Sequence, residues 1–467
     1  MNTVIWWIRR DLRLFDNPTL QTALEQGAVV PLFIIDPQLY SSVSDRRRHF
    51  LLNGLKALDH DLRARGSLLI LKNGPPEKIL HKIFYASHAV NIYAEEDYTP
   101  YARQRDNKVA HSLPLKLVQG QLVHHPMTIR KPDGTPYTVF TPFSKTWKAL
   151  LPAGLKTLPA PAEIPFPEIK LPSDPFPSAE SDPGFPAGEQ QALQRLQAFT
   201  AAPCAPALYE YASGRDRLDQ EGTSGLSPYF HFGILSVRQA VAAARQASTA
   251  AAAPGQHAGA EVWINELIWR EFYISILYYF PRVLRGNFRK QYDGIVWSND
   301  QEHFQAWKQG ETGYPIVDAA MRQLEMTGWM HNRARMITAS FLVKDLLIDW
   351  RWGESWFLQN LLDADLAANN GGWQWTAGTG TDAAPYFRIF NPVLQSRKFD
   401  PQGDYIRRWL PELAHLPSKT IHTPWQTGST VSGYPAPIVD HKAAREHTLH
   451  AFKTARNEQR RHNDRSI

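Results

Sequence analysis

Five short apolar segments, separated by polar or amphipathic stretches, occupy the first 120 residues and limit the fold more than any other feature of the chain. They cover residues 4–8, 28–36, 67–73, 89–96 and 115–120. Each has the length and composition of a buried strand, whereas residues 46–66 carry apolar side chains at helical spacing and end in a glycine. Such alternation is typical of a parallel sheet with helices on both faces. A doubly wound, Rossmann-like α/β domain is therefore predicted.

The turn after the first apolar segment reads RRDLRLFDNP. It lacks the GxGxxG pattern that brings a dinucleotide pyrophosphate to a helix N-terminus. The predicted sheet therefore lacks the usual dinucleotide fingerprint.

The second half of the chain has a different pattern. Residues 152–186 contain ten prolines and little helical periodicity, which predicts an extended linker. From about residue 190, helical spacing recurs over 189–199, 236–248, 260–280, 315–328 and 333–350, and strand-like segments are nearly absent. The alanine-rich stretch 247–260 is expected to be a surface loop. We predict an α/β domain over 1–131, an interdomain linker over 132–199 and an all-α domain over 200–467.

Composition and charge narrow the class of protein. The formal net charge is +6. Such a basic excess is found in nucleic-acid-binding proteins and also in many other soluble enzymes. A single cysteine, Cys204, excludes an intrachain disulfide framework and favours a reducing compartment. With no CxxC or HExxH motif, no metal site is expected. The apolar segment 267–280 carries two charges and is too short to span a bilayer, so a cytoplasmic protein without membrane contact is predicted.

Two predicted helices carry polar and aromatic side chains on one face. Glu266, Trp269 and Arg270 lie at helical spacing, with Trp263 one turn earlier. Two indoles beside a carboxylate suit a flat heterocycle, although Glu266 and Arg270 could instead form an ordinary helix ion pair.

In GWMHNRARMI, Asn332, Arg335 and Met336 also share a face. An amide beside a thioether suits an aromatic ligand with polar edges. The alternative is a core methionine on a helix with solvated arginines.

The stretch LLDADLAANNGGWQW places two carboxylates, two adjacent amides, two glycines and two tryptophans within thirteen positions. Tryptophans are costly to leave exposed, so a solvated loop would be unusual here. Asp363 and Asp365 could form an acid/base pair or accept hydrogen bonds from a cofactor, and Gly371 and Gly372 permit close approach of a ligand to the backbone. The segment GTSGLSP, residues 222–228, offers hydroxyls and backbone N–H groups for phosphates, or caps a helix.

Several long motifs resemble one known family. They are WWIRRDLRLFDNPTL, GTSGLSPYFHFG, VWINELIWREFY, TGYPIVDAAMRQLEMTGWMHNRARMITASFLVKDLLIDWRWGESWF and DLAANNGGWQWTAGTGTDAAPYFRIFNP. They resemble the photolyase/cryptochrome family, specifically the class I cyclobutane pyrimidine dimer photolyases, from residue 4 to about residue 445. The resemblance implies an α/β domain, a long linker and a helical domain that holds FAD.

The resemblance also implies which residues hold the flavin. The implied contacts are Tyr211, Thr223, Ser224, Gly225, Leu226, Ser227, Trp263, Arg270, Arg335, Asp363, Ala364, Asp365 and Asn369. Gly225 departs from the Arg or Lys that many relatives have there, which puts one phosphate-side contact in doubt.

Asn369 is implied to face flavin N5, where plant cryptochromes have Asp and animal cryptochromes have Cys. A neutral amide can accept a hydrogen bond from a protonated N5 without adding charge, so Asn369 favours repair over signalling. Trp373, Trp350 and Trp297 match the members of the family's electron-transfer chain, which photoreduces oxidised flavin.

The implied reaction is light-driven repair of DNA: excited reduced FAD passes an electron to a cyclobutane dimer, the ring splits and the electron returns. Photolyases as a class act on bases flipped out of the duplex. The implied substrate contacts are Glu266 and Asn332 at the base edges, Trp269, Trp375 and Met336 around the dimer, and Arg215, Arg333 and Arg388 at phosphates.

Related activities fit less well. The segment HNRARM places Asn332 and Met336 where (6-4) photolyases have histidines, and NNGGWQW differs from the DASH-type NYGNW. Two other classes stay open: a cryptochrome-type flavin photoreceptor without repair activity, and a light-independent flavin oxidoreductase, for which no nicotinamide site is evident. The segment EEDYTPYARQRD leaves a folate antenna, an 8-hydroxy-5-deazaflavin antenna or none as alternatives. A monomer is expected.

Overall fold

The computed structural model describes residues 1–41, 43–201, 207–251, 253–426 and 431–464; Cys204 lies outside these ranges. The chain forms two compact units. The first comprises residues 1–212, 223–279 and 362–365, and the second comprises residues 213–222, 280–361 and 366–467. Because the units are defined by packing and not by order along the chain, the predicted domain boundaries at 131/132 and 199/200 stay a prediction.

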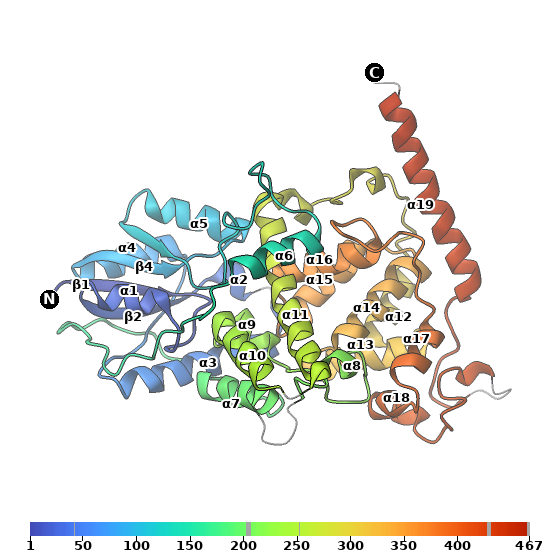
Figure 1. Cartoon of the computed structure of the whole chain (residues 1–467), viewed down its shortest axis with the longest axis horizontal. Helices are drawn as coiled ribbons and strands as arrows, with labels where there is room; N and C mark the ends of the chain where they lie inside the picture. Colours follow the sequence, from blue (N-terminus) through green and yellow to red (C-terminus); the bar gives the residue numbers. More distant parts are fainter. Residues whose placement is uncertain (42, 202–206, 252, 427–430, 465–467) are drawn as a thin grey trace. The chain divides into compact units, whose positions relative to one another are not determined.

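The first unit is built on a five-stranded parallel sheet in the order β3-β2-β1-β4-β5 (Figure 1). The strands are β1 (Thr3–Ile8), β2 (Ala28–Ile35), β3 (Ile70–Asn73), β4 (Ala89–Glu95) and β5 (Leu115–Val118). Every residue of β2 is buried, as expected for a strand covered on both faces. All five predicted strands and the predicted fold class are confirmed.

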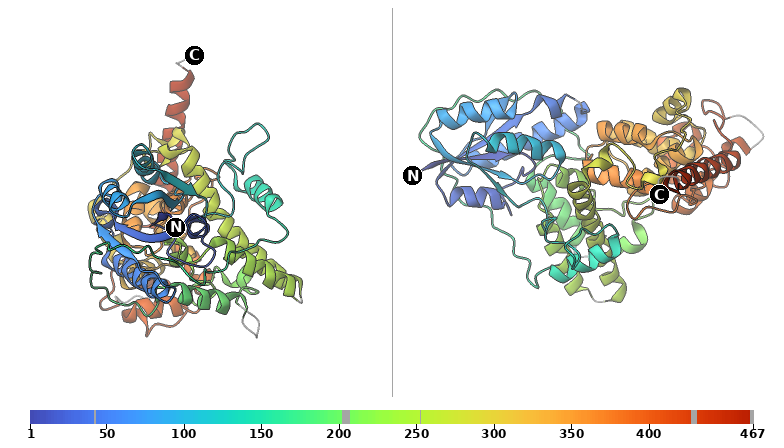
Figure 2. Two further views of the ribbon diagram at one scale, coloured as in Figure 1. Left: turned by 90° about the vertical axis from the view of Figure 1, so that its left-hand side faces the viewer. Right: turned by 90° about the horizontal axis from the view of Figure 1, so that it is seen from above.

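Helices cover both faces of this sheet, with α3 on one side and α4 and α5 on the other (Figures 1 and 2). They are α1 (Pro18–Leu24), α2 (Pro37–Tyr40), α3 (Asp45–Arg63), α4 (Pro76–Ala86) and α5 (Pro100–Ala110). Three of them begin with a capping side chain followed by proline: Asn17, Asp36 and Thr99 each accept a hydrogen bond from a backbone N–H of the first turn. Proline fits the first helical position because its missing N–H would be unpaired there.

The proline-rich segment has no regular helix or strand from residue 152 to residue 188, as predicted. It is bonded to the α/β part of the chain: the Val29 N–H of β2 donates to the Pro165 carbonyl at 2.8 Å, and the Ile164 N–H donates at 2.9 Å to the carbonyl of Arg65, just after α3. Two helices flank it, α6 (Phe140–Leu150) and α7 (Glu189–Thr200).

The rest of the first unit is helical, with α9 (Ser227–His231), α10 (Val237–Ala250) and α11 (Pro254–Tyr279). The predicted surface loop over 247–260 is wrong for the described residues, because α10 extends to Ala250 and α11 begins at Pro254. Alanine has the highest helix propensity and proline is tolerated in a first turn, so low sequence complexity did not indicate a loop.

The second unit is mostly helical. Its longer helices are α12 (Gln301–Gln309), α13 (Pro315–Thr327), α14 (Asn332–Ser340), α15 (Trp350–Asn360), α16 (Leu366–Ala377), α17 (Pro392–Phe399), α18 (Asp404–Trp409) and α19 (His441–Asp464). The single turn α8 (Tyr211–Gly214) begins in the first unit and ends in the second. The single helix predicted over 333–350 is interrupted: α14 ends at Ser340, a π-helical turn follows over Phe341–Asp345, and α15 begins at Trp350. Among the described residues, no helix combines the length and apolarity needed to cross a membrane.

Candidate functional site

In the first unit, the turn after β1 makes the contacts that organise the predicted flavin-binding segments. The Arg10 guanidinium donates from Nη2 to Asp365 Oδ2 at 2.7 Å and from Nε to the His231 carbonyl at 2.8 Å. Arg10 Nη2 also lies 3.4 Å from His231 Nδ1. A single arginine at the carboxyl end of the central strand thus contacts the segments around residues 231 and 365.

The protonation states of this cluster follow from burial and from its arginines. Burial alone would raise the pKa of Asp365, but the charges of Arg10 and Arg270 outweigh it and hold that pKa well below its usual range. Burial, with the charges of Arg10 and Arg47, lowers the pKa of His231 well below 6.5. The cluster therefore contains an ionised Asp365 and a neutral imidazole at pH 7.

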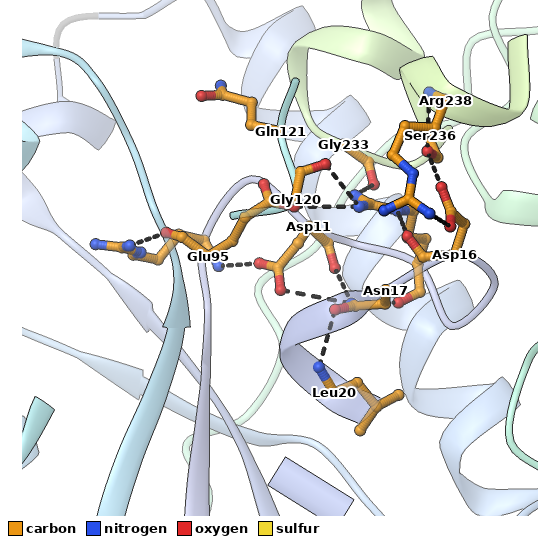
Figure 3. A network of polar contacts seen from close by, with 12 residues as sticks. Asp11, Asp16, Asn17, Leu20, Glu95, Gly120, Gln121, Gly233, Ser236 and Arg238 are labelled. Atoms are coloured by element: carbon orange, nitrogen blue, oxygen red, sulfur yellow. Dashed lines mark hydrogen bonds and ion pairs between the residues drawn. The ribbon is translucent and has the colours of Figure 1, made fainter. Parts of the chain in front are cut away.

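A second set of contacts attaches residues 233–238 to the same turn (Figure 3). Arg13 donates to the Gly233 carbonyl at 3.0 Å and to Glu95 Oε1 at 3.1 Å. Asp16 accepts a hydrogen bond from the Ser236 hydroxyl and pairs with Arg238 at 3.2 Å. Gly233 has a φ of +61°, and a Cβ there would lie 1.6 Å from the Arg10 carbonyl oxygen, so only glycine fits.

Two other predicted flavin contacts of the first unit, Tyr211 and Trp263, belong to a buried aromatic cluster. Tyr211 and Trp263 are 8% and 3% exposed, and their rings both contact Phe199, at 5.8 and 5.1 Å. Ser224 Oγ accepts a hydrogen bond from the Leu226 N–H at 3.4 Å, which shapes the turn before α9.

Gly225 has a structural reason for its departure from the family pattern. Its φ is +60°, and a Cβ would lie 2.6 Å from Arg195 Nη1. The Arg195 guanidinium packs over Phe185 and Tyr229, so it occupies the space that a side chain at position 225 would need.

In the second unit, Asn369 is oriented by helix α15. Its Nδ2 donates to the Glu354 carbonyl at 2.9 Å, while Asn370 Nδ2 donates to Glu354 Oε1 at 2.8 Å. Because a carbonyl can only accept, the nitrogen of the Asn369 amide must face Glu354, and Oδ1 lies at the other end of the amide plane. Burial raises the pKa of Glu354 to about 7.

The two predicted inner tryptophans are buried where α15 and α16 meet. Trp350 is 0% and Trp373 is 2% exposed, and Trp350 Nε1 donates to Asn287 Oδ1 at 2.9 Å. A Cβ on Gly353 would lie 2.1 Å from Trp373 Cη2, so the indole rests directly on the α15 backbone. Trp297 is partly exposed and its ring meets Phe452 of α19 edge to face at 6.0 Å.

The predicted substrate residues are partly exposed. Trp269 stacks on Phe140, with centroids 3.7 Å apart and planes at 3°. Asn332 Nδ2 lies 3.9 Å from Met336 Sδ, so the predicted amide–thioether pair is adjacent in space. The residues at the exposed or partly exposed surface also include Arg215, Glu266, Trp375 and Arg388.

Arg333 is already paired in the protein. Its Nη2 lies 2.7 Å from Asp216 Oδ1, and its guanidinium lies over the Phe399 ring at 4.4 Å. Arg335, which is a predicted flavin contact like Asn369, donates from Nε to the Met330 carbonyl at 2.8 Å.

Comparison with known proteins identifies the family. Residues 4–165 match the DNA photolyase family model, and residues 263–454 match the FAD-binding domain of DNA photolyase. The deoxyribodipyrimidine photo-lyase of Synechococcus is 43% identical over 94% of both chains, and that of Escherichia coli is 41% identical over 98% of this chain and 99% of its own. The chain belongs to the DNA photolyase family. Its predicted family, enzyme class and FAD cofactor are thereby confirmed.

Solved structures agree with this assignment. A bacterial class III photolyase from Agrobacterium tumefaciens superposes with a TM-score of 0.89 at 37% identity, covering 98% of each chain. A cryptochrome from Synechocystis gives 0.88 at 31% identity, covering 97% of this chain and 99% of its own. The fold of this photolyase-family protein is thus shared by repair enzymes and by a cryptochrome.

Several residues of the site were not predicted from the sequence. Arg10 lies within the motif WWIRRDLRLFDNPTL, but its partner Asp365 is 355 positions away. Arg47, His231 and Glu354 likewise gain their roles from packing, and no local pattern indicates them. Among the described residues, no group of three or more His, Cys, Asp or Glu side chains could hold a metal ion.

Proposed function

We propose that this photolyase-family protein repairs cyclobutane pyrimidine dimers in DNA under light. The observation that carries the proposal is full-length similarity, at 41–43% identity, to proteins named deoxyribodipyrimidine photo-lyase. When bound, reduced FAD supplies the light-driven electron transfer to the dimer. The chain's own residues bind, orient and shield the reactants.

The proposed flavin-binding residues are chemically suited to FAD. Ser224 and its neighbours in 223–227 provide hydroxyls and N–H groups for the phosphates. Trp263 and Tyr211 offer aromatic surface, and the ionised Asp365 offers an acceptor for flavin N–H and hydroxyl groups. The remaining contacts proposed from the family pattern are Thr223, Gly225, Leu226, Ser227, Arg270, Arg335, Asp363 and Ala364.

Asn369 is proposed to keep the flavin in its electron-rich form. Its Nδ2 donates to the Glu354 carbonyl, so Oδ1 is available as an acceptor. An amide oxygen accepts a hydrogen bond from a protonated N5 and adds no charge. This orientation supports binding of reduced flavin, the form that repair requires.

Trp373, Trp350 and Trp297 are proposed to carry electrons to oxidised flavin. The first two are fully buried, which shields an oxidised indole from solvent, and Trp297 is partly exposed, which gives external reductants access. These three tryptophans would restore the reduced cofactor and take no part in the repair cycle itself.

For the substrate, Glu266 and Asn332 are proposed to hydrogen-bond the edges of the flipped bases. Trp269, Trp375 and Met336 would contact their faces. One face of Trp269 is already covered by Phe140, so the stack presents a rigid surface to the dimer. Arg215, Arg333 and Arg388 are proposed to bind phosphates.

A repair assay tests the proposal. Pre-reduced protein is mixed with an oligonucleotide that contains one dimer and exposed to blue light, with a dark sample as control. We expect light-dependent loss of the dimer, and Glu266→Ala should repair more slowly while retaining FAD. A protein that binds FAD but leaves the dimer intact in the light would instead be a photoreceptor, the alternative suggested by its similarity to the Synechocystis cryptochrome. Repair that proceeds equally in the dark would contradict both.

We further propose a cytoplasmic monomer that binds dimer-containing DNA, with domains over 1–131, 132–199 and 200–467.

A second chromophore of the folate or 8-hydroxy-5-deazaflavin type is proposed as an antenna. The solved structure of an archaeal photolyase from Sulfolobus tokodaii, 34% identical with a TM-score of 0.82, contains two FAD molecules, which imply a novel light-harvesting cofactor in that protein. The absorption spectrum of the purified protein distinguishes these chromophores.

A further inference from the structure

The carboxyl end of β1 is the point where the sheet topology changes direction. The chain passes from β1 to β2 on one side, whereas β4 pairs with β1 on the other. Ligands of doubly wound sheets bind at this point, outside the carboxyl ends of the strands. Here the same place is filled by the protein's own charged side chains, Arg9, Arg10 and Arg13.

These arginines have different partners. Arg9 pairs with Asp106 at 2.6 Å and Arg13 with Glu95 at 3.1 Å, and both partners belong to the predicted α/β domain. Arg10 differs, because its ion-pair partner is Asp365, 2.7 Å away, in a segment far along the chain. The Asp365 N–H donates to the Asp363 carbonyl at 2.6 Å, so this segment is a tight turn.

The surroundings of Asp365 make Arg10 its principal counter-ion. Asp365 is 8% exposed, and it faces Arg10 through a direct hydrogen bond, with Arg270 of α11 and the imidazole of His231 nearby. Arg10 itself faces the acidic side chains of Asp97 and Glu95.

Arg47 of α3 acts on the other carboxylate of the turn. Its charge interacts with Asp363, and it also repels a proton from His231. The turn 362–365 is therefore held by cations that come from the α/β part of the chain.

We propose that Arg10 is a positioning residue, which keeps the Asp365 carboxylate ionised and oriented for flavin binding. The sheet thereby contributes to flavin retention through a side chain that need not touch the flavin. This inference rests on the proposed role of Asp365 as a flavin contact.

A merely structural role for Arg10 predicts a different result. If Arg10 only attached two segments to each other, its loss would weaken flavin binding by the same factor at every pH. If it acts through the charge of Asp365, its loss leaves Arg270 as the main charge opposing the effect of burial, so the pKa of that carboxyl rises. Below the new pKa the carboxyl is protonated and the anionic acceptor is lost; as the pH rises the carboxylate forms again. The defect must therefore be larger at low pH.

The experiment measures the rate at which FAD leaves the holoenzyme after dilution, from the rise in flavin fluorescence, at pH 6.5 and pH 8.5. Arg10→Gln removes the charge and keeps a polar side chain, and Arg10→Lys keeps the charge. We expect Arg10→Gln to release FAD about tenfold faster than the unmodified protein at pH 6.5, which corresponds to about 1.4 kcal/mol, and about threefold faster at pH 8.5. Arg10→Lys should stay within about threefold at both pH values.

Arg9→Gln is the matched control. It removes a buried ion pair in the same turn, but one that involves Asp106 and not the segment 362–365. We expect it to lower thermal stability and leave the FAD release rate unchanged. Equal acceleration by Arg9→Gln and Arg10→Gln would overturn the proposal, because it would reflect general loosening of the turn.

A double variant tests whether Arg10 acts through Asp365. If it does, Arg10→Gln in the Asp365→Asn background should not accelerate release further. Multiplied effects, an unchanged release rate in Arg10→Gln, or a pH-independent increase would each contradict the inference. Failure of the unmodified protein to bind FAD or repair dimers would instead contradict the proposed function, so the two outcomes are distinguishable.

Discussion

The proposed role of Trp373 in flavin photoreduction can be tested separately from repair. Its indole is buried between α15 and α16, against Gly353 and the Phe357 ring, whose centroid is 5.0 Å away. We expect Trp373→Phe to slow photoreduction of oxidised flavin at least about tenfold, because phenylalanine is much harder to oxidise than tryptophan. Repair by chemically reduced protein should remain nearly intact. Flavin absorbance under illumination and the dimer assay measure the two steps separately.

Trp307 provides a control for this substitution. It is fully buried, its ring lies 6.1 Å from that of Trp373, and its Nε1 donates to the Thr338 carbonyl at 3.1 Å. Trp307→Phe disturbs the same packing but removes none of the three tryptophans predicted to transfer electrons, so photoreduction should persist. Equal losses of photoreduction and repair in Trp373→Phe would show that the residue serves structure instead.

At this scale the sequence predicts what lies close along a helix and misses what lies far along the chain. The adjacency of Asn332 and Met336 follows from helical spacing, and the structure places the two side chains together. The pairing of Arg10 with Asp365 does not follow from any spacing, because no periodicity relates two residues 355 positions apart. The orientation of the Asn369 amide was equally inaccessible, since it depends on a carbonyl of another helix.

Among the secondary-structure elements, prediction succeeded where one local signal dominated. The five strands are short, apolar and bounded by polar turns, and all five form. The interruption between Ser340 and Trp350 was missed because residues 341–348 are apolar except for Lys344 and Asp345, so their spacing gives no sign of a π-helical turn or of the positive φ of Leu347. Tertiary packing decides the backbone there.

The contact between α15 and α16 depends on Gly353. A methyl group at this position would lie 2.1 Å from Trp373 Cη2 and 2.6 Å from Leu342 Cδ2, so neither neighbour can simply move aside. We expect Gly353→Ala to lower the free energy of unfolding by about 2 kcal/mol or more. Denaturant unfolding of the flavin-free protein measures this value.

Gly372 of α16 provides the control for Gly353→Ala, because an added Cβ at residue 372 meets no atom within 4 Å. Gly372→Ala should raise the free energy of unfolding of the flavin-free protein by about 0.5–1 kcal/mol, the usual gain for replacing a helical glycine. Equal effects of the two substitutions would refute the packing argument.

Helices α6 and α11 are joined by a buried carboxyl. Glu271 accepts hydrogen bonds from Trp147 Nε1 and the Val123 N–H, both at 2.6 Å. Burial raises its pKa to about 7. The folded protein therefore retains a proton on Glu271 that the unfolded chain loses above about pH 4.5. The contribution of this protonated carboxyl to the free energy of unfolding is complete below that pH, and it is lost as the pH rises through 7. Glutamine has no proton to lose. We expect the free energy of unfolding of Glu271→Gln, relative to the unmodified protein, to increase by about 2 kcal/mol between pH 5 and pH 8.

Glu261 is the matched control on the same pair of helices. It is 53% exposed and pairs with Lys148 of α6 at 2.7 Å. Glu261→Gln should shift the free energy of unfolding by less than about 0.5 kcal/mol. If Glu271→Gln shows a difference that is constant from pH 5 to pH 8, the proposed protonation of Glu271 is wrong.

For the whole molecule, the effect of the +6 net charge on DNA binding depends on where the basic side chains lie. Binding to DNA releases counterions from phosphates, and the affinity falls with salt in proportion to the number of phosphates neutralised. Arg333 is the proposed phosphate contact whose surroundings the structure defines best. We expect Arg333→Ala to weaken binding of dimer-containing DNA and to reduce the slope of log K against log salt by about one unit or less. Arg322→Ala, which removes an arginine paired with Glu412 at 2.6 Å and assigned no DNA contact, should leave the slope unchanged.

The ion pair of Arg333 with Asp216 makes a stronger test possible. Asp216 lies 2.7 Å from Arg333 Nη2, so a DNA phosphate must compete with this carboxylate for the guanidinium. Asp216→Asn removes the competing charge while keeping a hydrogen-bond acceptor, and Arg333 stays stacked on Phe399. We therefore expect Asp216→Asn to bind DNA about two- to fivefold more tightly at 0.1 M salt, an effect of about 0.4–1 kcal/mol, and to lose this gain when combined with Arg333→Ala. Fluorescence anisotropy across a salt series measures all three variants. Tighter binding that persists in the double variant would show that Asp216 repels DNA directly and that Arg333 is not the phosphate contact.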